Sequence, residues 1–323
     1  MIRASGYNDT FNIVVEAMNR EIEPEISVPD KGKLRASRQR EVSLMIRAFC
    51  RDPLAVVSLL AILVFILGAI LAPVLTPYPD QGRGDPNILE KFKPPSKLHP
   101  LGTDYLGRDV LARLLFGGRV SLSMGLLVVI VAVLVGFPLG ALAGYFGGWL
   151  DNLIMRITDM FLAFPSLLLA MAIAAALGPS FTNTMIAIAL TWWPWYTRLV
   201  RAQVVSLREL YFIEAARSLG VRDAVIIWRH VVPNVMTPVL VQATMDLGSA
   251  ILVGAAISFI GLGVQPPTPE WGSMISAGRI YFIERPWFAG AAGSAIFLVT
   301  LSFNLLGDAI RDVADPRTRR ITK

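Results

Sequence analysis

The side chains of this chain that suit a specific interaction gather in one polar segment, residues 214–234, between two long apolar stretches. The segment opens with a carboxylate and two small residues, Glu214, Ala215 and Ala216, which allow a partner surface to approach closely. Gly220 follows, and glycine readily takes the left-handed conformation that ends a helix. This combination indicates a docking contact rather than a chemical reaction.

The rest of the chain offers no set of residues for catalysis or metal binding. Its two histidines, His99 and His230, lie outside the apolar stretches, and its one cysteine, Cys50, excludes an internal disulfide. The pattern GxxxxGK[ST], which binds nucleotide phosphates, does not occur. We therefore expect a chain that is not an enzyme, with no metal site and no cofactor of its own.

Two short helices are expected to position the polar segment. Residues 209–219 are good helix formers that end at Gly220. A second helix is expected over about 222–230, with Pro233 as the boundary before the next apolar stretch. The segment is therefore predicted to be a helix–turn–helix at a membrane surface.

The composition is that of an all-α integral membrane protein: 323 residues, 54% hydrophobic, with a mean hydropathy of +0.57. A helix needs about 20 apolar residues to cross a bilayer. The uncharged run 160–197 is too long for one crossing and is interrupted at Gly178-Pro179-Ser180, so a hairpin of two spans is expected there. The six predicted transmembrane helices lie in residues 54–75, 120–150, the two halves of 160–197, 238–264 and 288–307.

Six spans place both termini on the same side of the membrane. Seven Lys or Arg residues lie between Lys31 and Arg51, and the tail after Arg311 is basic, which favours the cytoplasm for both. The segment 214–234 falls on that side too. The loop 76–119 opposes this orientation with seven basic residues, but it also holds five acids, and the bias weakens in long loops.

The spacing in the polar segment resembles the EAA loop of permease subunits of ATP-binding-cassette (ABC) importers. That loop has Glu-Ala-Ala, three residues, a glycine, nine residues, and a hydrophobic–x–hydrophobic–Pro end, here 230–233. His230 departs from the hydrophobic residue, but RHVVPN is similar to the variant in peptide and nickel permeases. Residues 99–122, 194–203 and 257–274 also resemble that oligopeptide/dipeptide permease C subfamily, and the likeness covers about residues 45–315.

The resemblance implies the fold of a type I importer permease with a MetI-like core. It also divides the chain into a cytoplasmic tail (1–52, the first 30 residues disordered), a first span with an external loop (53–119), a five-helix core (120–310) with a coupling loop at 201–235, and a cytoplasmic basic tail (311–323). A short helix is expected over 104–116, with Asp104–Arg108 and Asp109–Arg113 pairs. It either helps to receive a solute-binding protein or braces the bundle.

The resemblance further implies a function and partners. The coupling helix, with Glu214, Ala215, Ala216, Arg217 and Gly220, would sit in a groove of an ATP-binding subunit; the alternative is an ordinary surface helix. The complex would contain a second homologous permease, two ATPase subunits that hold ATP and Mg, and an extracytoplasmic binding protein. It would lie in a bacterial or archaeal cytoplasmic membrane, in contact with lipid and without nucleic acid.

Four further residues are candidates for a role in transport or in helix packing. Asp246 is the one acid well inside an expected span. It lines the translocation path, pairs with a basic residue near the inner mouth, or precedes a span that begins later than expected. Gly136, Gly140 and Gly144 recur at every fourth position, which favours close helix packing. That packing is either static, within this subunit, or a sliding contact with the partner permease.

The expected substrate is a di- or oligopeptide, with nickel or glutathione as alternatives. A secondary transporter that works without ATP is the competing class. The small number of spans and the lack of an evident inverted repeat oppose it. A membrane enzyme is opposed by the lack of a nucleophile–base pair.

Overall fold

The computed structural model describes residues 43–314, and these residues form helices joined by loops, with a single isolated β-bridge between Thr103 and Asp109. The expectations for residues 1–30 and for the tail beyond 314 lie outside this range. All elements described below belong to one compact unit that begins at Phe49.

The helices follow one another in this order: α3 (Pro53–Ile70), α4 (Ala72–Leu75), α5 (Pro79–Arg83), the 3₁₀ turn η1 (Ile88–Glu90), α6 (Val110–Phe146), α7 (Gly148–Leu162), α8 (Ser166–Leu177), α9 (Phe181–Arg208), α10 (Tyr211–Ser218), α11 (Asp223–Ile226), the π-helical turn η2 (Ile227–Val231), α12 (Val232–Ile260), α13 (Trp271–Gly278), the 3₁₀ turn η3 (Arg279–Tyr281) and α14 (Pro286–Ala314).

The described residues contain the long apolar helices of a multi-pass membrane protein. Four are long and apolar enough to cross a bilayer, namely α3, α6, the continuous helix Asp223–Ile260 and α14, and the bent pair α7 and α8 is also long and apolar enough when its two halves are taken together. The sixth helix is α9, whose 28 residues include Arg198 and Arg201. The predicted all-α fold with six membrane helices is confirmed.

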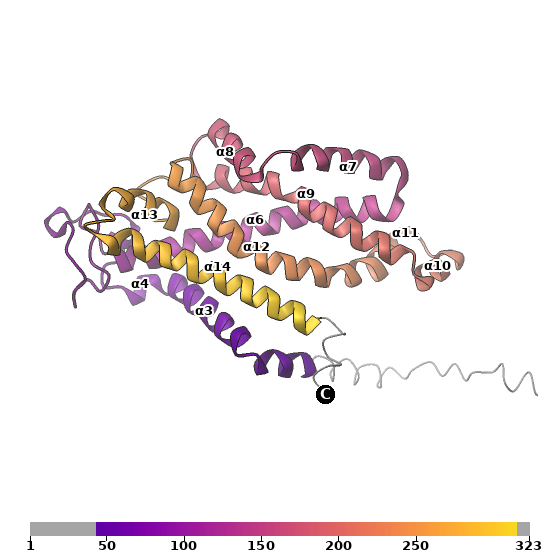
Figure 1. The fold of residues 1–323 in the computed structure, drawn as a ribbon, viewed down its shortest axis with the longest axis horizontal. Coiled ribbons are helices and arrows are strands. Elements are labelled where there is room, and N and C mark those ends of the chain that lie inside the picture. The colour runs from indigo at the N-terminus through magenta and orange to yellow at the C-terminus, as the bar shows by residue number, and fades with distance from the viewer. Residues whose placement is uncertain (1–42, 315–323) are drawn as a thin grey trace, which may run out of the picture. The chain divides into compact units, whose positions relative to one another are not determined.

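The core of the unit is built on α6 and α9, which pack along each other, while α12 contacts both. On the other side of α12 lies α14, which also packs against α3 and α13 (Figure 1). The fully buried side chains of Met124, Tyr196 and Ile257 belong to one hydrophobic cluster that joins α6, α9 and α12.

The expected short helix over 104–116 is wrong. Residues 104–109 form a loop, and α6 begins at Val110, so the helix also runs across the expected division at residue 119. Asp109 caps α6 by accepting a hydrogen bond from the backbone N–H of Ala112 at 2.6 Å. The Asp104–Arg108 pair forms at 2.7 Å, whereas Arg113 lies 3.7 Å from Asp104 instead of pairing with Asp109.

The third crossing also begins earlier than expected, at Gly148 rather than near residue 160. The charges of α7 ended the uncharged run in the sequence, but Asp151 and Asp159 are paired with Arg201 and Arg198 of α9. The chain bends by 85° between α7 and α8, just before Pro165 becomes the N-cap of α8. The turn at residues 178–180 lies where it was predicted, between α8 and α9.

Pro233 does not separate two helices, contrary to expectation. The chain is helical from Asp223 to Ile260, with the π turn η2 between α11 and α12. A proline is tolerated in the first turn of an α-helix because its missing N–H would have no partner there. Pro233 occupies that position in α12, directly after the π turn.

Candidate functional site: the α10 loop and the cavities of the helix bundle

The α10 loop, residues 208–223, joins α9 to α11. Its helix ends in a Schellman motif: Gly220 has φ +72°, its N–H donates to the carbonyl of Arg217 at 2.9 Å, and the N–H of Val221 donates to the carbonyl of Ala216 at 3.1 Å. The glycine therefore reverses the chain after two turns of helix, within the predicted range 209–219.

The α10 helix is amphipathic, with one anchor on its inner face. Ile213 is fully buried in the main hydrophobic cluster, and Ala216 packs partly against it. The outer face carries Glu214 and Ala215, which are exposed. Tyr211 and Leu219 are 88% and 83% exposed at the two ends of the helix. This face therefore presents a carboxylate and a small residue between two large apolar side chains.

Arg217 lies apart from that outer face. Its guanidinium lies over the ring of Tyr145, with its central carbon 4.6 Å from the ring centroid, and its Nε donates to the tyrosine Oη at 3.3 Å. The carboxylate of Glu214, by contrast, has no hydrogen bond or ion pair within the described part of the chain.

Asp246 lies on α12 and lines a cavity of about 340 Å³ between the end of α7, α8, α9 and α12. The Oη of Tyr196 donates to its carboxylate at 2.7 Å, and the Nε2 of Gln242 donates to the other oxygen at 3.0 Å. No basic side chain bonds to it among the described residues. The wall of the cavity adds Ser166, Thr191 and two tryptophans to these polar groups.

Gly136, Gly140 and Gly144 all face α9 of the same chain. A Cβ on Gly140 would lie 2.5 Å from the carbonyl oxygen of Thr197, and one on Gly136 would meet the carbonyl of Trp193 at the same distance. A Cβ on Gly144 would lie 2.8 Å from a side-chain carbon of Val204. The three glycines therefore let the backbones of α6 and α9 approach more closely than any side chain would permit.

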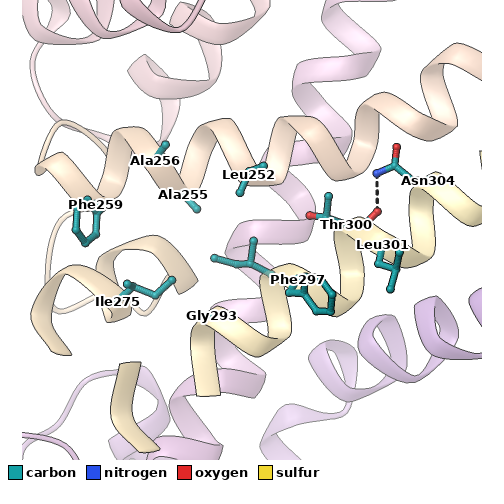
Figure 2. Close-up of a pocket in the computed structure, with 11 residues that line it drawn as sticks. Leu252, Ala255, Ala256, Phe259, Ile275, Gly293, Phe297, Thr300, Leu301 and Asn304 are labelled. Atoms are coloured by element: carbon teal, nitrogen blue, oxygen red, sulfur yellow. Dashed lines mark hydrogen bonds between the residues drawn. The ribbon is translucent and has the colours of Figure 1, made fainter. Parts of the chain in front are cut away.

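A larger hollow of about 620 Å³ opens between α12 and α14 (Figure 2). Its wall is apolar apart from Thr300 and Asn304, and the Nδ2 of Asn304 donates to the carbonyl of Thr300 at 2.8 Å. This hollow contains no titratable group among its described lining residues.

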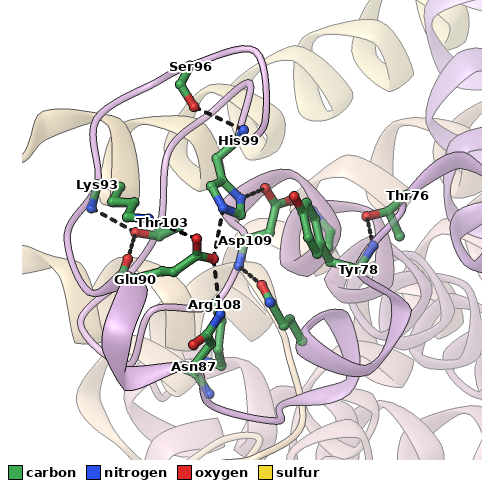
Figure 3. A network of polar contacts seen from close by, with 12 residues as sticks. Thr76, Tyr78, Asn87, Glu90, Lys93, Ser96, His99, Thr103, Arg108 and Asp109 are labelled. Carbon is green, nitrogen blue, oxygen red and sulfur yellow. Dashed lines mark hydrogen bonds and ion pairs between the residues drawn. The ribbon is translucent and has the colours of Figure 1, made fainter.

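A polar network that the sequence did not predict lies before α6 (Figure 3). We call residues 76–109, together with Glu270, the cap. His99 is buried at its centre, with Nδ1 2.9 Å from the carboxylate of Asp109 and Nε2 3.1 Å from that of Glu90. Tyr78 stacks on the imidazole at 4.8 Å. The two carboxylates lie nine and ten residues from His99 in an irregular loop, a spacing that carries no recognisable pattern.

Two carboxylates of the cap have pKa values shifted from the ordinary value of glutamate. The pKa of Glu90 is lowered, chiefly because the ammonium of Lys93 bonds to it at 2.8 Å. Burial raises the pKa of Glu270. The Glu270 carboxylate caps α13 by accepting from the N–H groups of Gly272 and Ser273, both at 2.8 Å, and it also accepts from the Oγ of Ser121 at 3.2 Å. Among the described residues, no three His, Cys, Asp or Glu side chains are grouped to hold a metal ion.

Comparison with known proteins places the chain in a family. Residues 136–320 match the family of binding-protein-dependent transport system inner membrane components. Residues 42–95 match the N-terminal TM domain of oligopeptide transport permease C. Among solved structures, the methionine ABC transporter MetNI in an inward-facing conformation has a chain with the same fold, with a TM-score of 0.51 at 17% identity, which covers 64% of this chain and 97% of the other.

Curated relatives cover most of the chain. The dipeptide transport system permease protein DppC of Alkalihalophilus pseudofirmus is 44% identical over 92% of this chain and 96% of its own length. The probable D,D-dipeptide transport system permease protein DdpC of Escherichia coli is 43% identical over 82% of this chain and 88% of its own length. The glutathione transport system permease protein GsiD of Pectobacterium atrosepticum is 42% identical over 84% of this chain and 90% of its own length. This chain therefore belongs to the family of inner-membrane permease components of binding-protein-dependent ABC transporters.

Proposed function

We propose that this chain is the membrane-spanning subunit of an ATP-driven importer that moves di- or oligopeptides from an external binding protein into the cytoplasm. The names of two relatives, a dipeptide and a D,D-dipeptide permease, support this substrate class. The match to oligopeptide transport permease C over residues 42–95 supports it independently.

The observation that carries the proposal is the outer face of α10. A helix of eight residues that buries Ile213 and leaves Tyr211 and Leu219 almost fully exposed has an unfilled apolar surface. The carboxylate of Glu214, between these side chains, is available to pair with a basic side chain of another subunit. A groove on an ATPase subunit would cover this apolar surface and supply the basic side chain. The coupling contact is therefore formed by Glu214, Ala215, Ala216 and Gly220, and Arg217 lies behind them.

The complex has the composition expected of this transporter class. A second homologous permease pairs with this chain, two ATPase subunits hold ATP and Mg²⁺, and an extracytoplasmic protein delivers the peptide. Both termini and the α10 loop lie in the cytoplasm of a bacterial or archaeal cell, since ATPase subunits reach α10 only there. The permease itself makes and breaks no covalent bond.

The cavity at Asp246 is the proposed section of the translocation path in this subunit. The Asp246 carboxylate bonds to a phenol and an amide, and to no basic group in the described chain. A negative charge on it is therefore not neutralised within the described chain and is available to a peptide ammonium group. Replacement of Asp246 by Asn keeps the size of the side chain and removes that charge. It is expected to slow uptake without loss of the ATPase subunits.

Glutathione is the second candidate substrate, because a glutathione permease is 42% identical over most of both chains. The two candidates separate in an uptake assay with the cognate binding protein, in which a labelled dipeptide and labelled glutathione compete. Uptake of glutathione alone would reject the dipeptide assignment and leave the permease role intact.

The test of the coupling role uses Glu214→Lys in the native complex. After purification in mild detergent, the variant should retain the ATPase subunits but hydrolyse ATP without transport, because the reversed charge disrupts the contact that transmits motion. Glu284→Lys, an exposed glutamate in the loop before α14, is the charge-matched control. Normal uptake by Glu214→Lys, or a wild-type chain that purifies without any ATPase, would reject the proposal.

A further inference from the structure

Three charged or polar side chains meet where the α10 loop touches the bundle. Tyr145 lies in the last turn of α6, Arg217 in the last turn of α10 and Asp223 at the start of α11. The Oη of Tyr145 donates to the Asp223 carboxylate at 2.5 Å and accepts from the Nε of Arg217 at 3.3 Å. One phenol therefore bonds to both sides of the turn 218–222.

The contact is specific to a tyrosine. The ring lies beneath the guanidinium of Arg217, a cation–π arrangement that any aromatic ring provides. The two hydrogen bonds require the hydroxyl, which donates with its proton and accepts with a lone pair. Tyr145 itself is only 2% exposed and belongs to the main hydrophobic cluster of the bundle.

The bundle side of this contact is firmly held. The α6 helix meets α9 at Gly136, Gly140 and Gly144, where the two backbones touch. Near the end of that seam, the guanidinium of Arg208, the last residue of α9, donates to the carbonyl of Gly144 at 3.1 Å. A displacement that reaches Tyr145 therefore reaches α6 and α9 together.

We propose that Tyr145 is a positioning residue that transmits the displacement of α10 to the α6–α9 pair. This inference rests on the proposed coupling role of α10. The other side-chain contacts of α10 are apolar or aromatic: Ile213 and Ala216 pack on the main hydrophobic cluster, and the ring of Phe212 lies 6.2 Å from that of His230. Such contacts fix an orientation less strictly than hydrogen bonds do, because apolar burial is not directional. The hydrogen bonds of Tyr145 fix the orientation of α10 relative to α6, so that movement of the ATPase subunits is converted into movement of the bundle.

The experiment compares Tyr145→Phe with the wild type in the complete complex, reconstituted in proteoliposomes with its binding protein and a peptide. The variant keeps the ring under Arg217 and removes both hydrogen bonds. We expect the number of ATP molecules hydrolysed per peptide transported to rise about tenfold or more, since about tenfold is the scale of a single lost hydrogen bond to a charged group and the variant loses two. Recovery of the ATPase subunits should stay unchanged.

Two further variants and a control complete the design. Asp223→Ala removes the acceptor and should match Tyr145→Phe, whereas Asp223→Asn keeps an acceptor oxygen and should restore most of the coupling. Tyr105→Phe is the matched control, because the guanidinium carbon of Arg108 lies 5.4 Å from the centroid of that ring, far along the chain from α10. It should leave the ratio at the wild-type value.

Each result decides for or against the inference. A normal ratio in Tyr145→Phe, combined with uncoupling by Glu214→Lys, would overturn the role of Tyr145 and leave the coupling role of α10 intact. Normal coupling in both variants would overturn the proposed function as well. If Tyr145→Phe does not assemble, equal ratios in Asp223→Ala and Asp223→Asn overturn the inference, and a high ratio in the alanine variant alone supports it.

Discussion

The cap and the α10 loop differ in where their polar and apolar side chains lie. In the cap, His99, Asp104, Asp109 and Glu270 are almost fully buried, and each is bonded to partners within the chain. In the α10 loop, Glu214 is exposed and two large apolar side chains extend into the surroundings. The cap satisfies these polar groups within the chain, whereas the loop leaves a carboxylate and two large apolar side chains exposed.

This difference has an energetic basis. A buried charge is tolerated only when it is paired and hydrogen-bonded. Removal of one polar group of the cap therefore leaves its buried neighbour without a partner. An exposed apolar side chain costs little in the free subunit and gains about 25 cal/mol for each Å² that a partner covers. Substitutions should therefore destabilise the subunit when they fall in the cap, and weaken assembly when they fall in the loop.

The largest effect on stability is expected from Glu270→Ala. It leaves the N–H groups of Gly272 and Ser273 and the hydroxyl of Ser121 without their acceptor, and should lower the free energy of unfolding by about 3 kcal/mol. Thermal unfolding of the purified subunit in detergent measures this loss. Glu284→Ala, at an exposed position, should unfold like the wild type; equal midpoints for the two variants would contradict this account of the cap.

The same carboxylate predicts a dependence on pH. Burial raises the pKa of Glu270 above the ordinary value of 4.5, so between these two values the folded chain holds a proton that the unfolded chain has lost. Stability should therefore fall as pH rises through that window, and be fully present below the ordinary value. Glu90, whose pKa is lowered, acts in the opposite sense, but only below 4.5.

Glu270→Gln removes this titration while it keeps one acceptor oxygen. On acidification toward pH 4.5, the unfolding midpoint of the wild type should rise, and that of the variant should rise less. Parallel curves for the two proteins would show that Glu270 does not cause the dependence.

A smaller effect is expected from Gly220→Ala. No atom lies within 4 Å of the added Cβ, so the cost arises only from the positive φ of +72° and should be about 1 kcal/mol. Thermal unfolding should show a small decrease, together with a clear loss of coupled transport because the end of α10 shifts. Unchanged transport would show that coupling does not depend on the Schellman turn.

The smallest effect on stability is expected from the double substitution of Tyr211 and Leu219 by alanine. Both side chains are exposed, so the free energy of unfolding should change by less than about 0.5 kcal/mol. Recovery of ATPase subunits with the tagged chain should nevertheless fall about tenfold or more, because the apolar contact is lost. If the double variant were destabilised but recovered the ATPase subunits normally, these two side chains would serve the stability of the subunit rather than its assembly.

Features that depend on local sequence were predictable. Long uncharged runs located five of the six membrane helices, and Gly220 located the end of α10, because apolar length and a left-handed turn are properties of neighbouring residues. The likeness to the permease family was also carried by contiguous motifs, and it is confirmed by the relatives.

Features that depend on distant partners were not predictable. The early start of α7 requires the arginines of α9, about 40 to 50 residues later, to neutralise its acids. The loop at 104–109 has helical i, i+4 charge pairs, but His99 and the N–H of Ala112 take the Asp109 carboxylate away from Arg113. The surroundings of Asp246 likewise come from four helices, α7, α8, α9 and α12.

The broken helix α7–α8 has a consequence for the synthesis of the protein. Its halves contain 15 and 12 residues, each shorter than the roughly 20 that cross a bilayer, and α7 carries Asp151 and Asp159. An acid near the centre of a membrane helix costs about 3 kcal/mol at the translocon. Since the neutralising arginines leave the ribosome later, we expect α7 to be inserted into the bilayer only after α9 has emerged.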